Sequence, residues 1–160
     1  MSSTVFPEFL AGRSALGLLF VRIVTGAAFM LHGWPKIQNP FGWMGPTSPV
    51  PGIFQALAAL SEFGGGLALI LGLLTPLACL GLACTMVVAI GMVHLPAGDP
   101  FVAMGGKRSF ELALVYLANV VMLLLAGPGV FSLDEVLFGR RGPEARSRSM
   151  QQVGPLARVG

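Results

Sequence analysis

The chain has 160 residues, of which 54% are hydrophobic and only 11% are charged, and its formal net charge is +3. Soluble domains average about 25% charged residues, so this composition excludes an ordinary soluble domain. The basic residues flank apolar segments and form no continuous stripe, so the positive charge indicates membrane topology and no nucleic-acid partner.

Four apolar segments follow one another along the chain, and each is long enough to cross a hydrocarbon core of about 30 Å. We predict membrane spans at 14–34, 53–74, 76–95 and 110–127. Residues 1–13 are predicted to form an interfacial lead-in, residues 14–138 the transmembrane domain, and residues 139–160 a basic, flexible, cytoplasmic tail. The expected fold is an all-α membrane protein, with four transmembrane helices in an antiparallel up-down bundle embedded in the lipid bilayer.

The distribution of basic residues predicts the orientation of this bundle. Four spans place both termini on one side, together with Arg13 and the arginines of the tail, whereas Lys36, Lys107 and Arg108 lie on the other side. Since short cytoplasmic segments carry the excess of Lys and Arg, we predict that both termini are cytoplasmic.

The first two spans each carry one charge near the middle, Arg22 and Glu62. A charge at the centre of a bilayer costs about 2.5–3.5 kcal/mol on insertion scales, so such residues tend to be paired, to face the bundle interior and to be functional. At a rise of 1.5 Å per residue, both lie about 13 Å from opposite membrane faces. We therefore predict a buried Arg22–Glu62 pair, with Asn119 of the fourth span completing its hydrogen bonds. A purely structural pair that fixes helix register is the alternative interpretation.

A second polar layer is expected at the outer mouth of the bundle. His32 and Lys36 are one turn apart and share a helix face, His94 ends the third span, and Glu111 begins the fourth. The rings of Trp34, Trp43 and Tyr116 are expected nearby, beneath the proline-rich loop that joins the first two spans.

Three ligands fit this outer layer. The preferred hypothesis is a quinone or similar apolar ring, with His and Glu side chains handling protons, because the unperturbed pKa of histidine lies near physiological pH. A metal held by His32, His94 and Glu111, or a haem held by the two histidines, is chemically reasonable. No spacing motif supports either, so no metal is predicted. Ordinary helix-end residues, with Lys36 reaching toward the interface, are the remaining interpretation.

The two cysteines, Cys79 and Cys84, are five residues apart and thus about 140° apart around a helix. They form no CxxC pair, so we predict two buried structural thiols and no thiol–disulfide chemistry.

Three motifs in order resemble the DoxX family of small bacterial membrane proteins: Arg22…Gly26…Phe29…His32-Gly33…Lys36, then Glu62-Phe63-Gly64-Gly65-Gly66, then Ser109-Phe110-Glu111 followed by Gly127-Pro128-Gly129. The resemblance covers about residues 14–138 and implies a four-helix bundle in the bacterial inner (plasma) membrane. It also implies a link to membrane redox systems, including a thiosulfate:quinone oxidoreductase, although many family members have no established activity. Val130 departs from the pattern, since many relatives are expected to carry a basic residue there.

The resulting functional hypothesis is an integral membrane component of a bacterial redox system, as a subunit or accessory of a quinone-linked oxidoreductase. Its partners would be other membrane or redox subunits. A non-catalytic structural or assembly subunit of a larger membrane complex is the alternative, and the sequence leaves open which of the two is correct. A small-solute carrier is disfavoured, since no paired interrupted segments are present.

Overall fold

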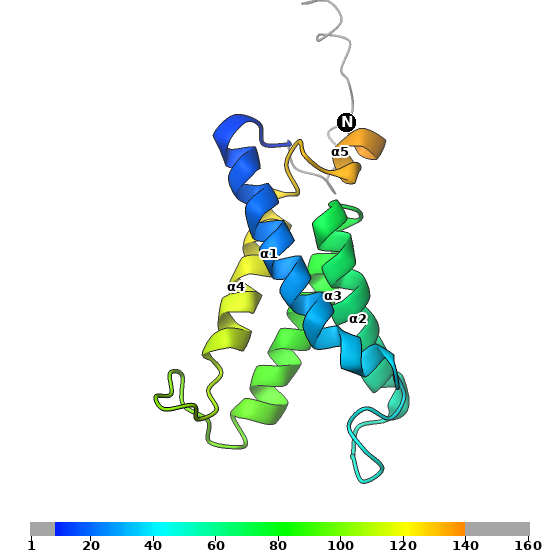
Figure 1. The fold of residues 1–160 in the computed structure, drawn as a ribbon, viewed down its shortest axis with the longest axis vertical. Coiled ribbons are helices and arrows are strands. Elements are labelled where there is room, and N and C mark those ends of the chain that lie inside the picture. The colour runs from blue at the N-terminus through cyan, green and yellow to red at the C-terminus, as the bar shows by residue number, and fades with distance from the viewer. Residues whose placement is uncertain (1–8, 140–160) are drawn as a thin grey trace, which may run out of the picture.

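The computed structural model describes residues 9–139, and within that range the chain is all-helical, without strands (Figure 1). The long helices are α1 (Gly12–Ile37), α2 (Gly52–Leu71), α3 (Thr75–Val88) and α4 (Glu111–Ala126), and α5 (Leu133–Phe138) is short. A π-helical segment, η1 (Ala89–His94), continues α3. The prediction of an all-helical chain is confirmed. The predicted flexible tail, apart from Gly139, and the first eight residues of the lead-in lie outside the described range.

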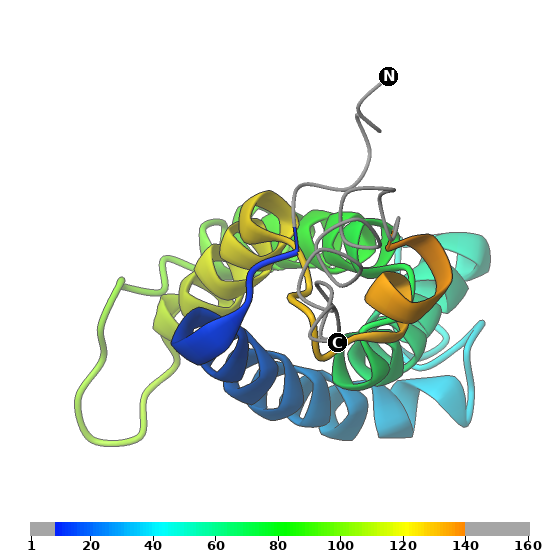
Figure 2. The same cartoon turned by 90° about the horizontal axis from the view of Figure 1, so that it is seen from above.

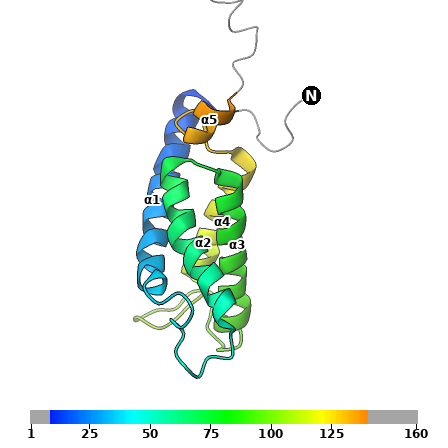
Figure 3. The ribbon, with the colours of Figure 1, turned by 90° about the vertical axis from the view of Figure 1, so that its right-hand side faces the viewer.

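Helices α1 to α4 lie side by side and alternate in direction (Figures 1 and 3). Viewed along the helices, they form a ring in chain order, with α5 over one end (Figure 2). Of the contacts between neighbours in this ring, those of α1 with α2 are the most extensive and those of α1 with α4 the least. The end with α5 and the start of α1 is called the terminal end, and the end with loops 38–51 and 95–110 is called the loop end.

The length and surface of these helices suit a bilayer. Gly12–Ile37, Gly52–Leu71 and Thr75–His94 are long and apolar enough to cross it, while Glu111–Ala126 is shorter. Large hydrophobic side chains such as Phe20, Leu77 and Leu125 are exposed, as expected of residues that face lipid. The structure is therefore that of a helical membrane protein.

Glycines set the register between α1 and α2. A Cβ atom added at Gly26 would lie 2.5 Å from the carbonyl oxygen of Gly66, and one added at Gly33 would lie 2.5 Å from the backbone nitrogen of Phe63. Small residues allow this close approach of two helix backbones in a membrane. Gly26 therefore lies opposite Gly66, and Gly33 lies opposite Phe63.

This register shows that the predicted Arg22–Glu62 pair is wrong. Arg22 lies one turn before Gly26 and reaches Leu69 on α2, seven residues beyond Glu62 and about 10 Å further along the axis at 1.5 Å per residue. The depth estimate failed because the helix ends are not level with the predicted spans. Helix α1 continues to Ile37 at the loop end, beyond the predicted residue 34, whereas α2 already ends at Leu71.

Arg22 instead donates hydrogen bonds to four backbone carbonyl groups. Its Nε donates to Leu69 at 2.8 Å, its Nη1 to Pro128 at 2.8 Å and Phe131 at 2.9 Å, and its Nη2 to Ile70 at 3.1 Å. The last carbonyl groups of a helix have no partner within it, and a cation is favourable there. Arg22 thus ties α1 to the end of α2 and to the segment that follows α4.

Two further polar side chains, those of Asp134 and Asn119, form hydrogen bonds between segments of the bundle. The carboxylate of Asp134 accepts the backbone N–H groups of Leu74 at 2.6 Å and Thr75 at 2.8 Å, which caps the start of α3. Asn119 was predicted to serve the Arg22–Glu62 pair, but its Nδ2 donates to Thr25 Oγ1 at 3.4 Å. These contacts hold helices together and leave the terminal end packed.

The cysteine prediction is confirmed only for Cys79. Both thiols are free, but Cys79 is buried and Cys84 is exposed on the outer face of α3. Five residues turn a helix by about 140°, so one thiol faces the core and the other faces away from it.

Candidate functional site

A cavity of about 280 Å³ lies at the loop end, inside the ring of helices. Small-molecule sites usually measure about 300–1,000 Å³, so this one suits a single ring or a head group of similar size. All four long helices, η1 and the end of loop 95–110 contribute to its wall. The lining residues are Phe29, His32, Lys36, Glu62, Met86, Ala89, His94, Ser109, Leu112, Ala113 and Tyr116.

Lys36 is the partner of the buried carboxylate. Its Nζ lies 2.6 Å from Glu62 Oε1, and the side chains of Lys36 and Glu62 are 23% and 3% exposed. The same Nζ lies 4.6 Å from the ring centroid of Trp43, a cation–π contact. The lysine thus joins the carboxylate of α2 to the loop above the cavity.

The second oxygen of this carboxylate receives no hydrogen bond from the part of the chain that the structure describes. Within residues 9–139, Glu62 Oε2 is buried and accepts no hydrogen bond. An unsatisfied buried acceptor costs about 1–3 kcal/mol, and nearly all buried polar groups have a partner. Because Glu62 lines the cavity, a ligand held there can supply the missing donor.

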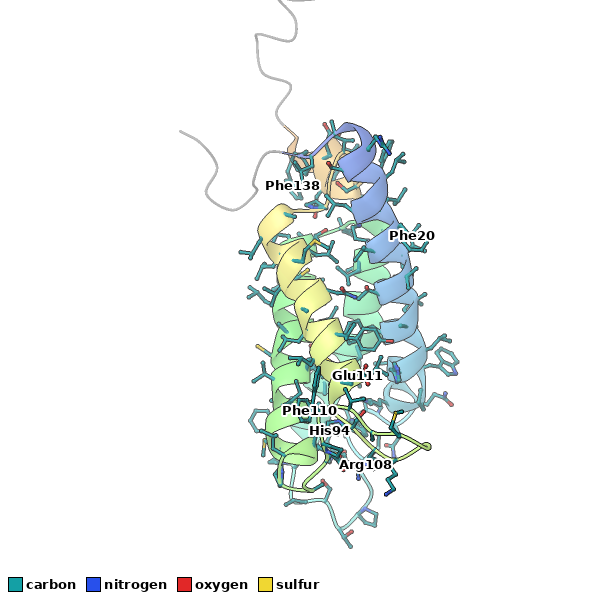
Figure 4. All side chains as sticks on the ribbon, turned by 90° about the vertical axis from the view of Figure 1, so that its left-hand side faces the viewer. Phe20, His94, Arg108, Phe110, Glu111 and Phe138 are labelled. Carbon is teal, nitrogen blue, oxygen red and sulfur yellow. The ribbon has the colours of Figure 1, made fainter. Side chains whose placement is uncertain are left out.

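His94 is oriented by a carboxylate in loop 95–110. Its Nδ1 lies 2.8 Å from Asp99 Oδ2, and Arg108 Nη2 lies 3.4 Å from the same oxygen. A hydrogen bond at one ring nitrogen fixes the role of the other, so Nε2 is the nitrogen free to exchange a proton. The ring ends a π-helical segment, a distortion that is frequent at functional sites. Figure 4 shows His94 and Arg108 together at the loop end.

Gln55 fastens loop 38–51 to the start of α2. Its Oε1 accepts from the backbone of Met44 at 3.0 Å, its Nε2 donates to the carbonyl of Val50 at 2.8 Å, and its own carbonyl accepts from Trp43 Nε1 at 2.9 Å. The Gln55 side chain is buried. These bonds place the Trp43 ring beside Lys36.

The structure brings together four of the residues predicted for the outer site: His32, Lys36, His94 and Tyr116 line the cavity. The Tyr116 ring lies 5.0 Å from that of Phe29 and 6.1 Å from that of His32. Glu62 was predicted to pair with Arg22, but it lines this cavity too and is its fifth residue with an ionisable side chain.

Two predicted site residues do not line the cavity. Trp34 is 56% exposed, and its ring lies 5.7 Å from that of Phe63. Glu111 is exposed at the first turn of α4 and lies outside the cavity wall. No three His, Cys, Asp or Glu side chains between residues 9 and 139 are placed to hold a metal ion, so His32, His94 and Glu111 form no such set.

Sequence reasoning missed two residues that shape the site, Asp99 and Gln55. Asp99 had a signal, because it lies in a Gly98-Asp99-Pro100 turn five residues after a histidine that ends a span. Gln55 had a weaker one, as an amide in an otherwise apolar helix start.

The helices, their apolar surface and the cavity together define a helical membrane protein with a cavity lined by polar and aromatic side chains at one end of its bundle. The chain belongs to the DoxX family, and a sequence model of that family matches residues 17–95. The predicted family is thereby confirmed.

Known relatives agree with this family. The "Inner membrane protein YqjF" of Escherichia coli is 31% identical over 124 residues, which cover 76% of this chain and 92% of YqjF. An "Uncharacterized membrane protein" of Mycobacterium tuberculosis is 29% identical over 84% of this chain and 90% of its own length. The "Putative oxidoreductase CatD" of Bacillus subtilis is 31% identical over 77% of this chain and 88% of its own length. No solved structure matches the chain. The protein is a multi-pass protein of the bacterial inner membrane.

Proposed function

We propose that this protein is a component of a membrane redox system, as a subunit or accessory of a quinone-linked oxidoreductase. In this proposal the loop-end cavity binds the ring of the quinone. The observation that carries the proposal is the buried carboxylate of Glu62, one oxygen of which accepts no hydrogen bond from the described residues, in a residue that lines the same cavity as His94 and the rings of Phe29 and Tyr116. The oxidoreductase name of the Bacillus relative supports the same class of chemistry.

Two of the ionisable groups that line the cavity, Glu62 and His94, are enough for the proton count of this chemistry. A quinol that gives two electrons to a partner redox protein also releases two protons. Glu62 and His94 each take one of them, and the Asp99 carboxylate stabilises the imidazolium that forms on His94. The electron-accepting partner is expected to be another subunit of the membrane complex.

We further propose that α4 is a fourth span, so that the bundle is up-down with both termini in the cytoplasm and the loop end outside. The 16 residues of α4 would span about 24 Å, and Phe110 together with the following Gly127-Pro128 segment extends the apolar stretch. Single cysteines at Arg13 and Lys107, in a chain with Cys79 and Cys84 replaced by alanine, test this. An impermeant maleimide should label only the cysteine at position 107 in intact spheroplasts. Labelling only of the cysteine at position 13 would show that the orientation is the opposite one.

Binding in lipid nanodiscs tests the proposed function. The wild-type protein should bind a short-chain quinol. His94→Ala should weaken this binding about tenfold, because the quinol loses its hydrogen bond to the imidazole. Glu111→Gln removes a carboxylate outside the cavity wall and is the matched control, expected to bind like the wild type. A wild-type protein that binds neither quinol nor quinone but co-purifies with redox proteins would instead establish a structural or assembly subunit.

A further inference from the structure

We infer that the cavity selects the reduced, hydroxyl-bearing form of its ligand, a quinol or comparable phenol, through a hydrogen bond donated to Glu62 Oε2. This inference rests on the proposed function, because it names which form of the ligand the same cavity recognises.

The hydrogen-bonding state of Glu62 decides the required polarity of the ligand. Oε1 already accepts from Lys36 Nζ at 2.6 Å, and no donor from residues 9–139 reaches Oε2. A carboxylate only accepts hydrogen bonds. A ligand that offers only carbonyl oxygens would leave Oε2 without a donor, whereas a hydroxyl group would satisfy it.

The neighbouring cations do not reverse this preference. Lys36 is the cation nearest to the carboxylate, and its ammonium group is held between Glu62 and the Trp43 ring. His94 uses Nδ1 toward Asp99, so its Nε2 can accept from, or donate to, a second oxygen on the ligand. A ring with two hydroxyl groups can therefore form one hydrogen bond with Glu62 and a second with His94.

The rest of the wall suits a flat ring. Phe29 and Tyr116 lie with their rings 5.0 Å apart at 44°, and Met86 and Leu112 also line the cavity. Aromatic faces and a thioether pack well against another ring. A polyol of the same volume would bury its other hydroxyl groups against these apolar side chains, so the aromatic wall limits the donor to a phenol-like group.

A bilayer-soluble ligand can reach this wall between α1 and α4. These two helices have the least extensive contact in the ring, and Figure 4 looks onto this side of the bundle. His32 and Leu112, one from each helix, both line the cavity and are both exposed. An apolar tail on the ring would extend through this side into lipid.

The experiment compares three matched ligands in nanodiscs: a short-chain hydroquinone kept reduced, the corresponding quinone, and the di-O-methyl ether of the hydroquinone. The ether keeps the ring and the oxygens but has no donor. The wild-type protein should bind the hydroquinone at least about tenfold more tightly than either of the others, since an unsatisfied buried carboxylate oxygen opposes both.

Glu62→Gln identifies the responsible atom, because it replaces one carboxylate oxygen by an NH₂ group, which donates hydrogen bonds, in nearly the same volume. The preference for hydroquinone over quinone should fall to about threefold or less. Lys36→Gln keeps the carboxylate, so the preference should survive in that variant. Size-exclusion profiles verify folding, and if Glu62→Gln does not fold, the wild-type comparison with the ether decides the matter alone.

The outcomes separate the inference from the proposed function. Equal wild-type affinity for all three ligands would overturn the inference and leave quinone binding standing. A hydroquinone preference that persists in Glu62→Gln would overturn the assignment to Oε2. Binding of none of the three would overturn the proposed function itself.

Discussion

Replacing Arg22 with methionine removes the guanidinium group that ties three segments together at the terminal end. Four carbonyl oxygens lose a hydrogen bond; the buried carbonyl of Pro128 loses its donor, whereas that of Leu69 still accepts from the N–H of Gly72 at 3.2 Å. An unsatisfied buried acceptor costs about 1–3 kcal/mol, and each of the other three lost hydrogen bonds costs about 0.5–1.5 kcal/mol. Part of this is offset because a charge no longer has to be desolvated, and methionine fills much of the space. We expect a net loss of about 3 kcal/mol in the free energy of unfolding.

Two matched variants separate the hydrogen bonds from the charge. Arg13→Met removes an exposed arginine from the same helix and should change the free energy of unfolding by no more than about 0.5 kcal/mol. Arg22→Lys retains the charge but replaces the planar fork by a single ammonium group with three donors. It should recover only part of the loss.

The assay is reversible unfolding in mixed detergent micelles, followed by far-UV circular dichroism as the denaturing detergent is increased. The reasoning predicts a clear shift of the Arg22→Met midpoint and almost none for Arg13→Met. Equal midpoints for these two variants would refute the conclusion that Arg22 stabilises the fold by joining α1 to the end of α2 and to the segment after α4.

A double-mutant cycle with Glu62→Gln checks the register in the same assay. Sites more than about 10 Å apart usually act additively within about 0.5 kcal/mol, so Arg22→Met and Glu62→Gln should be independent. A coupling energy above about 1 kcal/mol would indicate that Arg22 and Glu62 do interact, and it would contradict the register set by the contact of Gly26 with Gly66.

Three further changes probe other contacts. Gly26→Ala should destabilise by about 1–3 kcal/mol in the same unfolding assay, because its Cβ would meet the Gly66 carbonyl at 2.5 Å, whereas Gly17→Ala meets nothing within 4 Å and should be neutral or slightly stabilising. Asp134→Ala should cost about 1–3 kcal/mol, since two backbone N–H groups lose their acceptor; an unchanged midpoint would argue against the cap. Gln55→Leu should speed amide hydrogen exchange across loop 38–51 at least tenfold, as two side-chain bonds to the loop are lost; unchanged protection would show that other contacts hold it.

Local signals were sufficient for the helices and for part of the cavity. The apolar runs predicted the four long helices, since burial in lipid demands such runs. The rule that ionisable groups turn inward singled out His32, Lys36 and His94, which all lie near the predicted ends of their helices. These residues meet at the cavity wall, as the shared level of their helix ends predicts.

Pairings between helices could not be predicted in the same way. The partner of Glu62 depends on register, and register depends on the contact of Gly26 with Gly66, which no single segment contains. Arg22 and Lys36 lie about four turns apart on α1, and the register decides which of them reaches Glu62. Glu111 was misplaced for a related reason: an exposed position on the first turn of α4 follows from the rotation of that helix about its axis, which the sequence of one amphipathic turn does not fix.

The two ends of the bundle surround their buried charged side chains differently, and this difference favours a ligand site at the loop end. At the terminal end, all three guanidinium nitrogens of Arg22 donate to carbonyl oxygens. At the loop end, Glu62 pairs through one oxygen, and no donor among residues 9–139 reaches the other. A residue required only for helix register would gain stability if each of its charged atoms had a partner, as each guanidinium nitrogen of Arg22 has. The incomplete pairing of Glu62, beside a cavity rather than in packed core, is what a binding site requires, because the energy withheld from folding is available to a ligand.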